Sequence, residues 1–198
     1  MNALHRKQLI LDSVVDQSEG EVASLSGSLL VAHPALRDPN FRRAILFLSA
    51  HGPEVGALGV IINRPTPLSL ADLVATQSSE GLDRIVVYAG GPVQTEEVTL
   101  LCFRWSDDGM VVQPNLDLDE AATVMKAGTG EVRAYQGYAG WTPGQLEAEL
   151  RQQAWIVLPA QRNVFREAHD EKLWYRTVCE LGPAFKLLAQ APDDPSLN

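Results

Sequence analysis

The chain has 198 residues, 45% of them hydrophobic and 21% charged, with a formal net charge of −9. This composition is that of a globular protein with a sizeable core, and the acidic balance argues against broad electrostatic attraction to nucleic acid or anionic membranes. Residues 1–11 hold too short an apolar run for a secretory signal, and no stretch is long enough to span a bilayer.

Residues 1–24 are expected to form a partly flexible N-terminal extension, because the stretch at 16–21 is polar and contains glycine. Apolar runs bounded by turn residues then predict buried strands at 29–32, 44–49 and 57–62. Ser69 and Asp72 have the spacing of a partial capping box, which predicts a helix over residues 70–75.

Further strands are predicted at 84–88, 98–105, 131–138 and 154–158, with a hairpin turn at residues 107–109. Asp117 and Glu120 form a second capping box, before a helix that ends near Lys126.

A third helix is expected from Thr142 as N-cap, with Pro143 at the first helical position and Gln145 at the third. Residues 171–189 are predicted to be helical with a break near Gly182. The tail, 191–198, is expected to be disordered.

The order of these elements predicts an α+β fold with α/β-like character. Strands and helices interleave without strict β-α-β repetition, and several strands adjoin hairpin signals, which favours a mixed sheet. We expect residues 25–190 to form a single domain, with room for a small inserted lobe around residues 95–135.

One polar cluster combines His33, Asp38 and His51 with Arg42 and Arg43. A histidine oriented by a carboxylate can act as an acid–base pair near neutral pH, which makes the first three weak catalytic candidates. In the alternative interpretation Asp38 caps a turn, the arginines are solvated and His51 closes a loop. No nucleophile in a recognisable setting accompanies the pair, which favours this alternative.

A second polar cluster, Asn63 and Arg64 before Pro65, follows a predicted strand. A guanidinium fork at a strand end can bind a carboxylate or phosphate. Alternatively, Asn63 bonds the local backbone and Pro65 ends the strand.

Residues 137–146 place Tyr138 and Trp141 beside glycines, just before Gln145. The two rings can form a stacking wall for a ligand or a partner, or Trp141 can pack in the core at a strand-to-helix junction. Gly90 and Gly91 are interpreted as a tight turn, since they lack the spacing of a phosphate-binding loop.

The sequence contains no metal-ligand spacing and no nucleotide-binding or nucleophile-elbow motif, so no cofactor and no metal are expected. Cys102 and Cys179 lie far apart in apolar segments, which predicts two free thiols in a reducing cytoplasm.

Three segments together resemble the YqgE/AlgH family of bacterial proteins: residues 27–65, the turn at 90–93, and residues 137–146 with Trp155. The resemblance covers roughly residues 25–190. It implies a bifurcated, mixed sheet curled into a pseudo-barrel with helices packed outside. It attaches no activity, although one branch carries the label of a transcriptional regulator of alginate production. Family members have Leu-His where this chain has Leu101-Cys102, so we ask whether Cys102 replaces that histidine.

The function favoured by these observations is a non-enzymatic binding or regulatory module for a small anion or a protein partner. The candidate ligand-binding residues lie at strand ends: Arg42, Asn63, Arg64, Tyr138, Trp141 and Gln145. One alternative is a hydrolase or transferase that uses His51, Asp38 and His33. A second is a transcriptional regulator that binds DNA directly, which the net charge and the absence of a helix-turn-helix pattern disfavour. The oligomeric state is left open.

Overall fold

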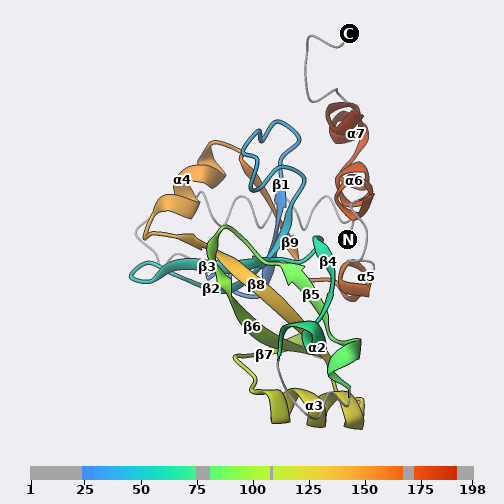
Figure 1. Ribbon diagram of the computed structural model, residues 1–198. Helices are drawn as coiled ribbons and strands as arrows, with labels where there is room; N and C mark the ends of the chain where they lie inside the picture. The colour runs from blue at the N-terminus through green and yellow to red at the C-terminus, as the bar shows by residue number, and fades with distance from the viewer. Residues whose placement is uncertain (1–23, 75–80, 108, 167–171, 191–198) are drawn as a thin grey trace.

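The computed structural model describes residues 24–74, 81–107, 109–166 and 172–190 (Figure 1). The expected N-terminal extension, apart from Ser24, and the expected tail at 191–198 lie outside these residues. The described strands are β1 (Ser28–Ala32), β2 (Ile45–Gly52), β3 (Gly56–Ile61), β4 (Pro65–Ser69), β5 (Val86–Ala89), β6 (Val93–Ser106), β7 (Gly109–Pro114), β8 (Glu131–Trp141) and β9 (Trp155–Pro159).

These nine strands form one mixed sheet. Its order is β4-β5-β8-β3-β2-β1-β9, with β6 paired to β8 and to β7. Only the β5–β8 pair is parallel among the described strand pairs. The predicted α+β class and mixed sheet are therefore confirmed.

The sheet branches at β8. Residues 131–138 of this strand pair with β6, while its other neighbours are β5, at residues 134–136, and β3, at residues 139–141. This is the bifurcation that the family resemblance implied, and the sheet is not closed into a barrel.

Six α-helices and one 3-10 helix are described. They are α2 (Leu70–Leu73), η1 (Leu82–Arg84), α3 (Leu118–Ala127), α4 (Gln145–Arg151), α5 (Arg162–Arg166), α6 (Lys172–Cys179) and α7 (Pro183–Gln190). In the described part of the chain, none of them is long and apolar enough to cross a bilayer. Figure 1 shows α3 at one end of the sheet, α4 on one side, and α5, α6 and α7 in a row along the opposite side.

Both predicted capping boxes form. The backbone N–H of Ser69 donates to Asp72 Oδ2 at 2.8 Å. Asp117 Oδ1 accepts from the N–H of Glu120 at 2.8 Å, and Glu120 Oε2 accepts from the N–H of Asp117 at 3.0 Å. The local pattern was sufficient here because these bonds span only three residues.

The predicted start of α4 is two residues too early. Gln145 does reach back to Thr142, since its Oε1 accepts from the N–H of that residue at 3.1 Å. The helix itself begins at Gln145, because Gly144 has the left-handed φ of 78° and cannot lie inside a right-handed helix.

The hydrophobic core has two parts. The larger part packs between the main sheet and the helices α4 to α7, and it includes the fully buried Phe47, Phe103 and Phe165. The smaller part is formed by the side of β6 and β8 that faces α3, together with the segment that holds α2 and η1. The predicted break in the 171–189 helix is confirmed between α6 and α7, whereas α5, β4 and β7 were not predicted.

Candidate functional site

The loop that joins β1 to β2, residues 33–44, is ordered by side-chain and backbone hydrogen bonds. Asp38 organises it, because its Oδ1 accepts from the N–H of Asn40 at 2.7 Å and its carbonyl accepts from the N–H of Arg42 at 2.7 Å. Arg43 then adopts a left-handed φ of 57° and turns the chain into β2. Asp38 therefore serves the turn through its side chain and its backbone alike.

Asn63 and Arg64, at the end of β3, hold this loop from outside. Asn63 is 2% exposed; its Oδ1 accepts from the N–H of Ile45 at 2.8 Å, and its Nδ2 donates to the carbonyl of Arg43 at 3.0 Å. The Arg64 guanidinium donates to the carbonyls of Asn40 at 2.7 Å and Arg42 at 3.0 Å. The two candidate ligand-binding residues thus position the loop.

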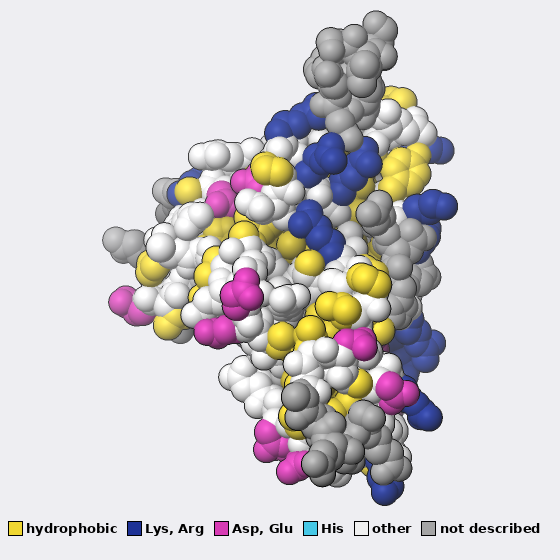
Figure 2. All heavy atoms as spheres, viewed as in Figure 1, with side chains coloured by type: hydrophobic (Ala, Val, Ile, Leu, Met, Phe, Trp, Pro, Cys, Tyr) yellow, Lys and Arg dark blue, Asp and Glu magenta, His cyan; other side chains and the backbone are white. Residues whose placement is uncertain are grey.

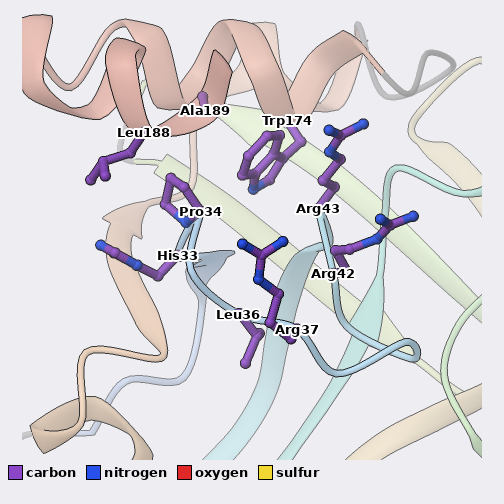
Figure 3. A pocket seen from close by; sticks show the side chains of 9 residues that line it. All are labelled: His33, Pro34, Leu36, Arg37, Arg42, Arg43, Trp174, Leu188 and Ala189. Carbon is purple, nitrogen blue, oxygen red and sulfur yellow. The ribbon is translucent and has the colours of Figure 1, made fainter. Parts of the chain in front are cut away.

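A small pocket lies where the loop meets α6 and α7. The loop contributes three arginines, and the helices contribute Trp174, Leu188 and Ala189 (Figure 3). The full lining consists of His33, Pro34, Leu36, Arg37, Arg42, Arg43, Trp174, Leu188 and Ala189. We call this the arginine pocket. Its volume of about 20 Å³ has room for one water-sized group.

The three arginines do not all point the same way. In Figure 3 the guanidinium of Arg37 extends toward the helices, whereas that of Arg42 extends away from the centre of the pocket. The Arg43 guanidinium lies 5.8 Å from the centre of the Trp174 ring, and the Trp174 indole N–H donates to the carbonyl of Ala32 at 2.8 Å. This stacked geometry anchors one guanidinium beside the pocket.

The lining of the arginine pocket contains three arginines and no Asp or Glu, whereas the whole chain is acidic. Figure 2 shows Lys and Arg side chains on the upper part of the face in view and along its right edge, whereas most Asp and Glu side chains lie to the left and below. A chain with a net charge of −9 therefore presents a local basic surface, which its net charge by itself does not reveal.

His33 lines the pocket without adding charge near neutral pH. Its Nδ1 accepts from the N–H of Ala35 at 3.1 Å, and its ring packs edge-on against Phe185. Burial lowers the pKa of His33, because the charged form loses hydration there. The neutral ring keeps Nε2–H as its donor.

His51 lies at the far end of β2, away from His33 and Asp38. Its seven-residue offset from the loop corresponds to roughly 20 Å of extended strand. Its Nδ1 accepts from the N–H of Leu25 at 3.1 Å, and its Nε2 lies 2.9 Å from Glu147 Oε1 of α4. The three candidate acid–base residues are therefore not brought together.

Trp141 and Gln145 belong to a cluster that docks α4 on the sheet. Glu149 Oε2 accepts from the indole N–H groups of Trp141 at 2.9 Å and Trp155 at 2.7 Å, while its Oε1 accepts from Gln145 Nε2 at 3.0 Å. Phe41 of the loop stacks on Trp141 at 6.3 Å between ring centres. Trp141 thus packs behind the loop.

Tyr138, on β8, is half-buried and packs against the larger core rather than lining the arginine pocket. Of the candidate ligand-binding residues, only Arg42 lines that pocket directly.

Cys102 and Cys179 are both free thiols. Cys102 is fully buried on the α3 side of β6, and burial raises the pKa of its thiol. A shielded thiol with a raised pKa is a weak nucleophile, so this position is unlike a catalytic one. No group of three or more His, Cys, Asp or Glu residues able to hold a metal occurs within the described ranges.

The second wall of the arginine pocket was not predicted from the sequence. The stacking wall expected at Tyr138 and Trp141 does not line this pocket, because α6 and α7 supply its second wall through Trp174 and Leu188. Arg37 was not among the predicted candidates either. The one available signal was the spacing of Arg37, Arg42 and Arg43 within a single short loop.

Comparisons with known proteins agree on one family. The profile of the AlgH-like family, DUF179, matches residues 29–186. A UPF0301 protein of Streptomyces avermitilis is 38% identical over 189 residues, covering 90% of this chain and 97% of its own length. Another from Chlorobium luteolum is 34% identical over 184 residues, covering 87% and 94% respectively.

Two solved structures share the fold. The solution structure of the AlgH protein from Pseudomonas aeruginosa is 28% identical, covers 89% of this chain and 98% of its own, and has a TM-score of 0.63. A crystal structure of a protein from Corynebacterium diphtheriae is 19% identical, covers 91% and 97%, and has a TM-score of 0.66.

Proposed function

The chain belongs to the AlgH-like family, and because its matched relatives carry no activity in their names, we propose a function from the site geometry. The protein is a binding module that holds one anionic group of a larger molecule in the arginine pocket. The observation that carries this proposal is that Arg37, Arg42 and Arg43 of one loop all line a pocket beside Trp174.

The size of the pocket limits what enters it. A volume of about 20 Å³ accepts one oxygen-bearing group, such as part of a phosphate or carboxylate, but not a whole metabolite. The rest of the bound molecule then lies across the exposed arginines. Guanidinium groups suit this task, because they present paired N–H donors to two oxygens at once.

The loop at residues 33–44 presents its arginines from a backbone that hydrogen bonds hold in one conformation. Asn63 and Arg64 bond the loop carbonyls at 40, 42 and 43, so the backbone that carries the arginines is already ordered. Ordering a site before it binds lowers the entropic cost of association. The acidic remainder of the protein disfavours long polyanions such as DNA and leaves isolated anionic groups as ligands.

Acid–base catalysis by His33, Asp38 and His51 gains no support from these positions. Each of the three side chains is used in hydrogen bonds within the fold, and His51 lies at the other end of β2. We place the protein in the cytoplasm as part of the same proposal, because both cysteines are free thiols and a reducing compartment keeps them so.

The test is a titration with inorganic phosphate, followed by NMR of backbone amides and arginine side chains. Saturable shifts at residues 33–44 and Trp174 are expected. Arg37→Gln should weaken binding about tenfold, which corresponds to one lost charge-assisted contact of about 1.4 kcal/mol.

Arg151→Gln is the matched control, because it removes the same charge from an exposed position on α4. An equal loss of affinity in this control would show that only net charge matters. The absence of saturable shifts in the loop would refute the proposal.

A further inference from the structure

A second, larger hollow lies at the other end of β6, apart from the arginine pocket. The last pairing of β6 with β8 joins Phe103 to Glu131, but β6 continues to Ser106 paired only with β7. The space beside residues 103–105 is bounded by the turn at 128–130 and by α5. Its volume is about 360 Å³, at the lower end of the range for small-molecule sites.

Three arginines surround this hollow, which we call the β6 cavity. Arg104 comes from β6, and Arg162 and Arg166 come from α5, where their i,i+4 spacing places them on one face. Arg104 donates to the neutral Gln113 at 2.9 Å. Within the described part of the chain, no carboxylate is paired with any of the three.

Arg133 positions the walls of the β6 cavity without lining it. This residue is 2% exposed, and its Nε donates to Glu131 Oε1 at 2.7 Å. Its Nη2 donates to the carbonyl of Phe165 in α5. One buried guanidinium therefore ties the start of β8 to α5 and holds the Glu131 carboxylate at the cavity wall.

An aromatic surface completes the β6 cavity. Trp105 lines it while packing edge-on against Phe165, with 5.6 Å between ring centres. The Trp105 side chain is only half-buried, so part of the ring faces the hollow. Flat rings of a ligand stack on indole, and guanidinium groups beside such a ring recognise the ligand's anionic end.

We propose that the β6 cavity binds a small aromatic phosphate, the chemistry shared by mononucleotides and simple aryl phosphates. The ring lies against Trp105, and the phosphate is held by Arg162 and Arg166. Glu131 accepts a hydrogen bond from a hydroxyl or amino group of the ligand. This site is independent of the proposed function, because it shares no residue with the arginine pocket.

The experiment compares four probes by calorimetry, each on the Arg37→Gln variant so that the weakened arginine pocket contributes little: adenosine monophosphate, adenosine, phenyl phosphate and inorganic phosphate. Adenosine monophosphate should bind at least about tenfold more tightly than either adenosine or inorganic phosphate, because only it offers both ring and charge. Phenyl phosphate distinguishes the two sources: equal affinity indicates aryl phosphates in general, and weaker affinity indicates nucleotides.

Trp105 also reports where the ligand binds. Adenosine monophosphate should change the intrinsic fluorescence of the wild type, and the change should disappear in Trp105→Phe, which keeps the aromatic wall and the affinity within a few-fold. A fluorescence change that persists in Trp105→Phe would place the ligand elsewhere and overturn the proposal.

Charge variants complete the test. Arg162→Gln combined with Arg166→Gln should raise the dissociation constant at least about tenfold. Arg84→Gln combined with Arg151→Gln removes the same charge from exposed positions elsewhere and should leave it unchanged. Equal losses in both double variants, or equal affinity for inorganic phosphate and adenosine monophosphate, would refute the site. Arg37→Gln should keep this binding, which separates failure here from failure of the arginine pocket.

Discussion

Replacing Asn63 by alanine tests whether this buried amide holds the arginine loop in place. The change removes the acceptor for the N–H of Ile45 and the donor to the carbonyl of Arg43. The Ile45 N–H is buried, so leaving it unpaired costs about 1–3 kcal/mol. The Arg43 carbonyl belongs to an exposed residue, where water replaces the lost donor at a cost below about 1 kcal/mol.

Together these terms predict that Asn63→Ala lowers the free energy of unfolding by about 1–4 kcal/mol. Urea unfolding followed by tryptophan fluorescence measures this, provided that the m-value stays constant. Asn163→Ala, at an exposed position of α5, is the control and should change stability by less than about 0.5 kcal/mol. A loss for Asn63→Ala no larger than that of the control would refute the reasoning.

Asn63→Asp separates the two hydrogen bonds. The aspartate keeps an acceptor for Ile45, but above its pKa it has no donor for the Arg43 carbonyl and places a charge in a site that is 2% exposed. Burial raises the folded-state pKa of such a carboxyl above its unfolded value. The loss of unfolding free energy relative to the wild type is therefore largest at high pH and shrinks as pH falls through the folded-state pKa. A loss that did not change with pH would contradict this account.

Three further predictions concern other parts of the fold. Glu149→Ala should lower the free energy of unfolding, measured with urea, by about 2–4 kcal/mol, because two buried indole N–H groups lose their acceptor. A loss below about 1 kcal/mol would contradict this prediction. Gly56→Ala should destabilise more than Gly27→Ala, although both glycines are left-handed, because only at 56 would the new Cβ lie 2.1 Å from the Trp141 carbonyl; equal melting temperatures would contradict it. The free energy of unfolding should fall less for His33→Gln than for the wild type as pH drops below about 6.5. The reason is that a histidine with a lowered folded-state pKa disfavours folding once it is protonated. Identical profiles of stability against pH for the two proteins would contradict this prediction.

Features that span a few residues were predictable from the sequence. The capping boxes at Ser69 and Asp117 formed as expected, because each joins groups three positions apart. The core strands β1, β2, β3 and β9 were found near their predicted positions, since continuous apolar runs bounded by turns have few alternatives. The start of α4 was misplaced because one left-handed glycine outweighed a favourable cap.

The candidate site was predictable only in part. Arg42, Asn63 and Arg64 were all named as candidates, but in two separate clusters. Their meeting at one loop, as one pocket residue and two positioning residues, depends on which carbonyls Asn63 and Arg64 reach. Those bonds join positions about twenty residues apart. Sequence spacing does not reveal them, because the register of β2 against β3 decides which groups meet.

By itself the sequence determined the α+β class, most element positions, the family resemblance and a cluster of arginines in one loop. Only the tertiary structure decided that α6 and α7 cover this loop, that Trp141 packs behind it, and that α5 brings Arg162 and Arg166 to the exposed end of β6. The physical reason is that helix and strand formation depends on nearby residues. The partner that an apolar face or a guanidinium meets is instead set by packing among segments far apart in the chain.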